Sequence, residues 1–234
     1  MIEKFDFETY LSISPNELGI YLFDINNYKN LYKKKIKVEN FTNLIDQNLL
    51  NYFLEKNIFK IEKQTGKFIK NIFLIIENNN IEKVSLGVKK KNYNKTISKK
   101  FLENLITDAK DLFRENYQDI KIMHILVNKH LLNDNFSELY KENLRGDYSS
   151  LELEFKFIYN SFAFEIENIL EKFQIKAVRY LDGVYIKNYF KDKNLDISEM
   201  AFEIKSGCNL NEVSISPKKH NKNGIFEKFF QLFS

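Results

Sequence analysis

Histidine and cysteine, the residues most often used in metal and nucleophilic sites, are scarce in this chain of 234 residues, which has three histidines and one cysteine. His124 and His130 fall on the same face of a strand if it runs unbroken between them, but no third metal ligand can be predicted. Cys208 could act as a nucleophile with His220 as its base, yet nothing brings the two together. The sequence therefore predicts no catalytic residue and no metal site.

Phosphate-binding loops need closely spaced glycines, and the glycines of this chain are far apart. The chain has seven glycines and two prolines in 234 residues. Both are well below the typical shares of about 7% glycine and 5% proline. Its closest pair of glycines is Gly207 and Gly224, which excludes both G-x-G-x-x-G and G-x-x-x-x-G-K. We therefore expect no nucleotide cofactor bound by such a loop, and the low glycine and proline content also excludes a collagen-like or low-complexity chain.

Residues 224–234 separate apolar from polar side chains when they are placed on a helix. They follow a polar linker, residues 213–223, which contains lysines and no acidic residue after Pro217. An amphipathic helix behind a basic linker is typical of attachment to an anionic membrane surface. The predicted membrane-binding residues are Ile225, Phe226, Phe229, Phe230, Leu232, Phe233, Lys218, Lys219 and Lys222. The alternative is a tail that folds onto its own core or into a partner's groove.

The overall charge gives little reason to expect nucleic acid as a partner. The formal net charge is +4, and only Arg114, Arg145 and Arg179 supply the guanidinium group that binds phosphates and guanines best. A single cysteine excludes an internal disulfide and agrees with a reducing cytosol. The acidic N-terminal residues do not resemble a signal peptide, and no apolar run is long enough to span a membrane. A cytoplasmic protein, soluble or at most peripheral, is expected.

The periodicity of the apolar residues predicts alternating strands and helices. The first strands form a hairpin around Pro15, and the lysine-rich third strand is suited to a solvated edge. A helix beginning at Ser98 has the clearest apolar face. The predicted strands are Tyr10–Ser14, Leu18–Asp24, Leu31–Val38, Asn71–Ile76, Val84–Val88, Lys121–Val127, Leu151–Phe157 and Lys176–Tyr180. The predicted helices are Asn43–Gln64, Ser98–Phe113, Ser161–Phe173, Tyr185–Phe190 and Ile197–Lys205, and residues 133–149 are predicted as a polar loop.

This order predicts an α/β fold, more fully a mixed α+β fold, in which one subdomain interrupts another. Residues 1–79 and 160–212 form a discontinuous subdomain, and residues 80–159 form an inserted strand-helix-strand-strand lobe. Residues 213–223 are the flexible linker, and residues 224–234 are the amphipathic membrane-targeting helix.

The order of these segments resembles the actin-like bacterial cell-division protein FtsA. Leu11-Ser12-Ile13-Ser14 lies where that family has its first phosphate loop, L-D-I-G-T/S, and Gly66–Ile76 lies where it has a helix end and the strand before its insert. Ile97–Leu102 is similar to the start of the insert's helix. Met123–Asp134 is similar to a strand and turn that the family writes roughly as h-v-l-P-q-x-y-x-i-D-g. The resemblance implies a partial actin-like, ribonuclease H-like subdomain.

The departures from the family's pattern bear on activity. Ser12 replaces the loop aspartate and Ser14 replaces the loop glycine, so the resemblance implies a loop without its metal-ordering carboxylate. After Tyr180 the sequence does not continue into the family's second phosphate loop. The expected partners are anionic lipid and division proteins, full-length FtsA or FtsZ. In the family the docking site for the tubulin-like FtsZ lies in that second half, so the resemblance does not carry an FtsZ-binding residue over to this sequence.

The sequence thus predicts a non-enzymatic peripheral membrane scaffold of cell division or envelope organisation, at the cytoplasmic side of the inner membrane. One alternative is a nucleotide-binding member of the actin-like ATPase superfamily that a partner chain completes. Another is a soluble α+β adaptor whose tail docks on protein. Phosphate-loop chemistry distinguishes the first alternative from the scaffold, and lipid binding distinguishes the second.

Overall fold

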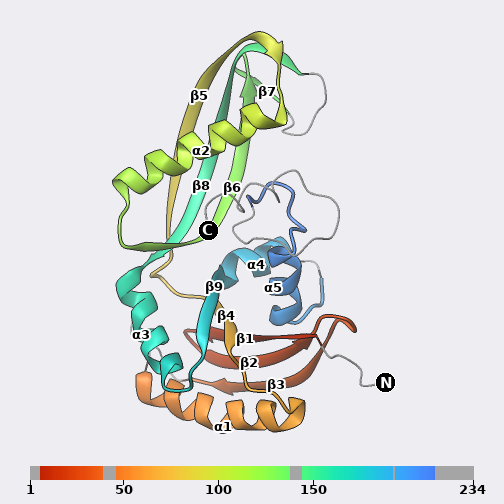
Figure 1. Ribbon diagram of the computed structural model, residues 1–234, viewed down its shortest axis with the longest axis vertical. Helices are drawn as coiled ribbons and strands as arrows, with labels where there is room; N and C mark the ends of the chain where they lie inside the picture. Colours follow the sequence, from red (N-terminus) through yellow and green to blue (C-terminus); the bar gives the residue numbers. More distant parts are fainter. Residues whose placement is uncertain (1–5, 39–45, 138–143, 192, 214–234) are drawn as a thin grey trace. The chain divides into compact units, whose positions relative to one another are not determined.

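The computed structural model describes residues 6–38, 46–137, 144–191 and 193–213, and the chain divides into two compact units (Figure 1). Unit 1 comprises Met1–Glu82 and Ile158–Cys208. Unit 2 comprises Lys83–Phe157 and the segment that begins at Asn209. The chain therefore leaves unit 1, builds most of unit 2, and returns.

Unit 1 contains a mixed sheet of five strands in the order β3-β2-β1-β4-β9. The strands are β1 (Phe7–Ser14), β2 (Glu17–Asp24), β3 (Lys29–Lys37), β4 (Asn71–Ile76) and β9 (Lys176–Asp182). β2 is antiparallel to both β1 and β3, whereas β4 is parallel to both β1 and β9. The lysine-rich β3 lies at an edge of the sheet, as its composition predicts.

Helices cover both faces of this sheet. Successive side chains of a strand point to opposite faces, and because neighbouring residues of the strands are both apolar, each face needs a cover. α4 (Gly183–Tyr189) and α5 (Ile197–Lys205) lie on one side in Figure 1, and α1 (Gln47–Thr65) and α3 (Asn160–Glu171) lie on the other. Tyr10 and Ile75 join the core beneath α4 and α5. α1 begins at Asp46, whose carboxylate accepts the N–H of Leu49, and ends at Gly66 in the left-handed conformation.

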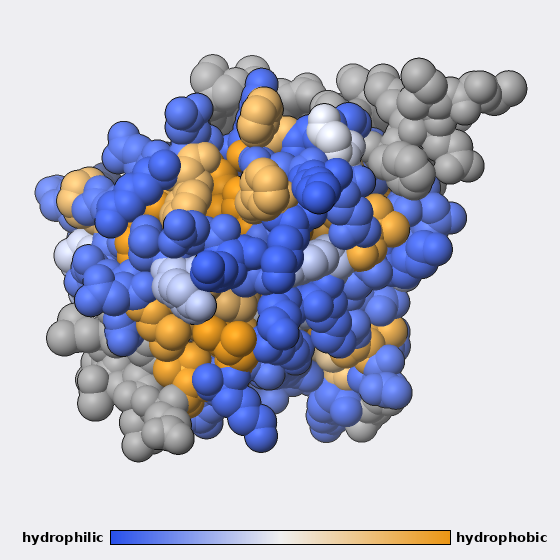
Figure 2. Space-filling model, turned by 90° about the horizontal axis from the view of Figure 1, so that it is seen from below, coloured by the Kyte–Doolittle hydropathy of each residue, from blue (hydrophilic) through white to orange (hydrophobic). Residues whose placement is uncertain are grey.

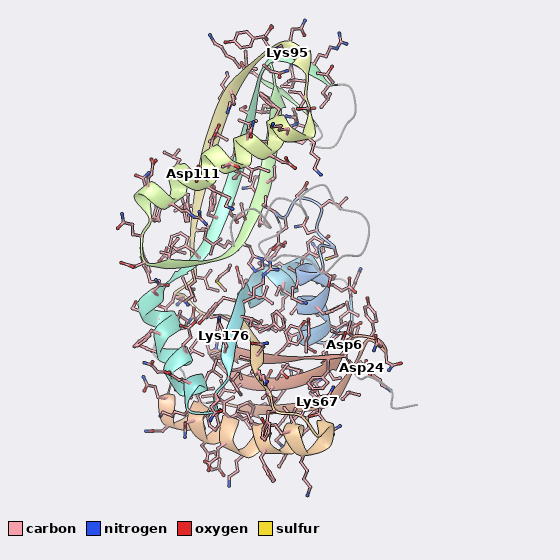
Figure 3. All side chains as sticks on the ribbon, viewed as in Figure 1. Asp6, Asp24, Lys67, Lys95, Asp111 and Lys176 are labelled. Carbon is pink, nitrogen blue, oxygen red and sulfur yellow. The ribbon has the colours of Figure 1, made fainter. Side chains whose placement is uncertain are left out.

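The turn between β2 and β3 is held by one buried carboxylate. Asp24 Oδ1 accepts the backbone N–H groups of Asn26 and Asn27 at 2.9 and 3.1 Å, and its Oδ2 accepts the side-chain amide of Asn27 at 2.8 Å. The Asn27 hydrogen bonds lower the pKa of Asp24, which keeps the carboxyl group ionised. Figure 3 shows Asp24 beside Asp6, whose carbonyl accepts the N–H of Ile25 at 3.1 Å.

Unit 2 contains a sheet in the order β5-β8-β6-β7, and the helix α2 lies against one face of it (Figure 1). Its elements are β5 (Glu82–Thr96), α2 (Lys99–Asn116), β6 (Ile120–Leu132), β7 (Asn135–Phe136) and β8 (Arg145–Tyr159). Ser98 caps α2 by accepting the N–H of Phe101 at 3.2 Å. The core holds Leu105 and Phe113 of α2, and Phe113 stacks on Phe155 of β8 with 4.2 Å between ring centroids.

The predicted fold class, a mixed α/β fold with an inserted strand-helix-strand-strand lobe, is confirmed by these two sheets. Several boundaries differ from the prediction: β6 continues to Leu132, and the inserted part of unit 2 spans Lys83–Phe157 instead of residues 80–159. The predicted loop at 133–149 contains β7 and the start of β8, and β5 continues to Thr96. The segment from Asn209 joins unit 2, whereas the first subdomain was predicted to extend to residue 212 and the linker to begin at 213.

Backbone pairing explains this last difference. The N–H of Val127 donates to the carbonyl of Asn211 at 2.8 Å, and the N–H of Val213 donates to the carbonyl of Ile125 at 2.9 Å. Residues 211–213 therefore run along β6, and Val213 is buried in the core of unit 2. The rest of the predicted linker and the predicted helix 224–234, with Lys218, Phe229 and the other predicted membrane-binding residues, lie outside the described residues.

Candidate functional site

The carboxyl ends of three parallel strands in unit 1 form the first candidate site. β1 ends at Ser14, β4 at Ile76 and β9 at Asp182, and because the strands are parallel these ends share one edge of the sheet. Ligands of open α/β sheets bind outside such an edge. The resemblance also places the expected phosphate loop here, after β1.

The connection between β1 and β2 is a closed hairpin. Ser14 pairs with Glu17, so only Pro15 and Asn16 connect the two strands. The hydroxyl of Ser14 donates to the carbonyl of Glu17 at 3.0 Å. Ser12 is 5% exposed, and its hydroxyl lies over Gly19, where a Cβ atom would be 2.5 Å from Ser12 Oγ. The side chain at the family's aspartate position therefore packs inside the hairpin and does not face a ligand.

An ion pair occupies the ends of β4 and β9. The backbone N–H of Glu77 donates to the carbonyl of Ile13 at 2.9 Å, which extends the pairing of β1 with β4. The carboxylate of Glu77 lies 2.7 Å from Lys187 Nζ of α4. Asp182 accepts the N–H groups of Val184 and Tyr185 and so begins α4. Glu77 and Asp182, the acidic residues at this edge, thus both bind to groups of the protein itself.

Gly183 is needed for this arrangement, because a Cβ atom there would lie 2.4 Å from Glu77 Cγ. Gly183→Val is expected to lower the free energy of unfolding by about 1–3 kcal/mol, the usual cost of inserting atoms into a packed site. Gly87→Val is the matched control, since a Cβ atom at Gly87 meets nothing within 4 Å. Urea unfolding of both variants tests this. Equal stability of Gly183→Val and Gly87→Val would show that the site adapts freely.

The two histidines of β6 bind different partners. His124 Nδ1 lies 2.8 Å from Glu212 Oε1, and both side chains are buried. His130 Nε2 lies 2.9 Å from Ser149 Oγ. The histidines therefore have separate partners, and in the described ranges no three His, Cys, Asp or Glu residues form a group that could hold a metal. Cys208 lies at the end of unit 1, partly exposed, and His220 is outside the described residues.

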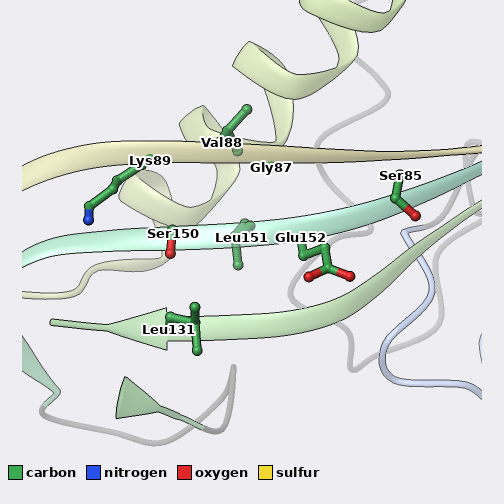
Figure 4. Close-up of a pocket in the computed structure, with 8 residues that line it drawn as sticks. All are labelled: Ser85, Gly87, Val88, Lys89, Leu131, Ser150, Leu151 and Glu152. Atoms are coloured by element: carbon green, nitrogen blue, oxygen red, sulfur yellow. The ribbon is translucent and has the colours of Figure 1, made fainter. Parts of the chain in front are cut away.

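The face of the unit 2 sheet opposite α2 carries a shallow hollow of about 400 Å³ (Figure 4). Three strands contribute its lining, which is Ser85, Gly87, Val88, Lys89, Leu131, Ser150, Leu151 and Glu152. Glu152 forms an ion pair with Lys129 at 2.9 Å. Because Gly87 has no side chain, the hollow reaches the edge strand β5.

A polar cluster lies beside this hollow. Lys89 Nζ is 3.3 Å from Asp134 Oδ1 and 3.7 Å from the ring centroid of Tyr148. The Tyr148 hydroxyl donates to Asp134, which lowers the pKa of the Asp134 carboxyl and raises the pKa of Tyr148. The cluster therefore fixes a lysine charge on β5 without burying it.

Some aromatic side chains of unit 1 are exposed to solvent. Phe59, Phe68 and Phe164 are 69%, 81% and 61% exposed. Figure 2 shows apolar residues on this side in separate groups between hydrophilic ones. Of the helices that the structure describes, none combines the length and hydropathy needed to cross a membrane.

Sequence reasoning missed the residues that close the strand-end edge. Glu77, Gly183 and Lys187 carry no motif, and their proximity depends on the pairing of β4 with β9. It also missed Glu212, which is 88 positions from its partner His124. The one available signal was Gly183 directly after a strand, a position where a close approach of side chains is common.

No protein-family model matches the chain, and no curated protein matches it. Three solved structures are similar. The first is the cytoplasmic domain of EpsL, which is an inner membrane component of the type II secretion system of Vibrio cholerae. The second is the PilM-PilN type IV pilus biogenesis complex, and the third is a protein of actin-like ATPase fold and unknown function from Bacteroides thetaiotaomicron. Their sequence identities are 10%, 10% and 15%, and their TM-scores are 0.36, 0.47 and 0.35.

The alignments cover 77%, 78% and 82% of this chain but only 57%, 49% and 60% of the similar structures. The chain thus spans about half to three fifths of their length. At these identities the likeness concerns the fold alone, and the roles in secretion and pilus assembly are those of the other proteins.

Proposed function

We propose that this chain is a non-enzymatic scaffold that attaches peripherally to the membrane and, like FtsA, acts in bacterial cell division or envelope organisation. The observation that carries the proposal is the closed strand-end edge of unit 1. There the hydroxyls of Ser12 and Ser14 lie within the β1–β2 hairpin, and Glu77 is bound to Lys187. A phosphate site at this edge would need free backbone N–H groups and a carboxylate that orders a metal.

The membrane part of the proposal rests on the sequence of residues 224–234. Their six apolar side chains, Ile225, Phe226, Phe229, Phe230, Leu232 and Phe233, share one helical face behind three linker lysines, Lys218, Lys219 and Lys222. The proposed location is the cytoplasmic side of the inner membrane. The proposed partners are anionic lipid and division proteins.

A nucleotide-binding protein completed by a partner chain is the second candidate. One observation favours it: β1, β4 and β9 are parallel, so their carboxyl ends form the kind of edge at which α/β proteins bind nucleotides. In this case a second chain would supply the glycine-rich loop that the sequence does not contain.

Calorimetry with ATP separates the two candidates. We expect the purified chain to give no saturable heat with ATP and magnesium at micromolar concentrations, and to release no phosphate, because Ser12 and Ser14 leave the loop without its carboxylate and its glycine. The matched titration contains EDTA instead of magnesium. Saturable binding that EDTA abolishes would contradict the scaffold proposal and favour the nucleotide-binding alternative.

A further inference from the structure

β5 is an open edge of the unit 2 sheet, and it presents two different rows of side chains. Among the strands that the structure describes, in the order β5-β8-β6-β7, it has a neighbour on one side only. Residues 83, 85, 87 and 89 are exposed, whereas residues 84, 86 and 88 are partly buried. Val84, Leu86 and Val88 pack against the core beneath α2. They are only partly buried, so part of each apolar side chain remains exposed at the edge of the sheet.

The exposed row is basic. The sequence of β5 contains five lysines and one glutamate. Lys89 and Lys90 have acidic partners in Asp134 and Asp108, with side chains that remain 54% and 42% exposed. Lys83 and Lys91 are exposed on the same row as Lys89. Charge of this sign along an edge repels a second copy of β5 and attracts an acidic strand.

The regular part of the edge ends at a defined point. Asn92 is 6% exposed, and its amide donates to the carbonyl of Gly146 at 3.1 Å. The next two residues, Tyr93 and Asn94, have φ angles of 52°. Residues 82–91 therefore form the stretch that can accept another strand.

We infer that β5 binds an extended segment of a partner protein in which acidic and apolar residues alternate. Such a segment would add a strand to the sheet by backbone hydrogen bonds. Its apolar side chains would cover Val84, Leu86 and Val88 on the α2 side. Its acidic side chains would face Lys83, Lys89 and Lys91, which are exposed on the other face of β5. This inference rests on the proposed scaffold function, for which it names a partner class.

The probe for this inference is a synthetic peptide of about ten residues in which glutamate alternates with valine, long enough to cover residues 82–91 at about 3.4 Å per residue. Hydrogen exchange of the full chain is measured with and without the peptide. We expect slower exchange of β5 amides in its presence and no change in α1. A scrambled peptide of the same composition, with the glutamates in one block, should not slow exchange in β5.

Charge reversal supplies the second measurement. Lys83→Glu combined with Lys91→Glu replaces two attractive cross-strand pairs by repulsive ones, which should weaken peptide binding on the order of tenfold. The matched control is Lys60→Glu with Lys100→Glu, which changes the net charge equally at exposed helical positions and should alter binding by less than about twofold.

Three results would overturn the inference. They are equal binding of the scrambled peptide, a concentration-dependent dimer that buries β5, and faster exchange of β5 after removal of residues 214–234. The last two would identify a second copy or the chain's own tail as the occupant. None of these measurements depends on lipid, so failure here is distinguishable from failure of membrane attachment.

Discussion

Glu212→Ala is expected to destabilise unit 2 by about 3 kcal/mol. Loss of a hydrogen bond by a buried neutral group costs about 1–3 kcal/mol, and breaking a buried ion pair costs about 3–5 kcal/mol, so the expected value lies where the two ranges meet. His124 and Glu212 are both buried, with side chains 0% and 3% exposed. The substitution removes the acceptor at His124 Nδ1. It also weakens the attachment of residues 211–213 to β6, to which their backbone hydrogen bonds and the buried Val213 contribute as well.

Two matched variants make this prediction specific. Glu152→Ala breaks the ion pair with Lys129, whose side chain is 55% exposed, and should cost at most about 1 kcal/mol. His124→Leu with Glu212→Leu removes both partners and should recover much of the lost stability, because replacing a buried pair by apolar residues is often neutral.

Urea unfolding followed by circular dichroism gives the change in stability, and hydrogen exchange of the β6 amides locates it in unit 2. Local exchange is needed because a chain of two units need not unfold in one step. Glu212→Ala no more destabilising than Glu152→Ala would show that the pair does not anchor the segment after Cys208.

The sequence predicted the elements whose signals are local. α2 has an apolar face and a serine cap, and both are present in the structure at Ser98 and along Leu105 and Phe113. β8 alternates buried and half-buried residues from Leu151 to Phe157, as its sequence indicates. These patterns succeed because one turn of helix or two residues of strand suffice to define the buried face.

The polar residues of a turn led to the prediction of a loop where β7 and the start of β8 lie. Asn133 and Asp134 have φ angles of 50° and 63°, and they form a tight turn between Leu132 and Asn135. Asparagine and aspartate adopt this conformation readily, so the pair forms a hairpin turn within what the sequence predicts as a loop. Its two-residue strand is too short to show a periodic pattern.

The candidate site was the least predictable part, because its contacts join distant segments. Glu77 and Lys187 are 110 positions apart. Each is a charged residue of the kind common on protein surfaces, so the sequence gives no reason to expect an ion pair at either position. Which charges meet is decided by the pairing of β4 with β9, and that pairing is not encoded in either strand alone.

Attachment to anionic membranes is the second large expected effect. Eleven residues are too few for a stable isolated helix, so residues 224–234 are expected to fold on meeting an interface. Burial of six apolar side chains at about 1.5–3 kcal/mol each sets a gross ceiling of roughly 9–18 kcal/mol. Partial burial and helix ordering should leave well under half of this, and the three linker lysines should add about 1 kcal/mol each at low salt.

Two variants separate the apolar face from net charge. Phe229→Glu with Phe230→Glu places two acids on the apolar face and should abolish attachment. Gln231→Glu with Ser234→Glu adds the same charge on the polar face and should weaken attachment while preserving it. Circular dichroism of both variants checks that the two units remain folded.

Flotation of the purified chain with anionic liposomes tests the scaffold account most directly. The account predicts that wild type and the polar-face variant float, that high salt reduces the floating fraction, and that Phe229→Glu with Phe230→Glu stays at the bottom of the gradient. A wild-type chain that ignores liposomes, or a double phenylalanine variant that floats as well as wild type, would contradict membrane attachment and favour an adaptor whose tail docks on protein.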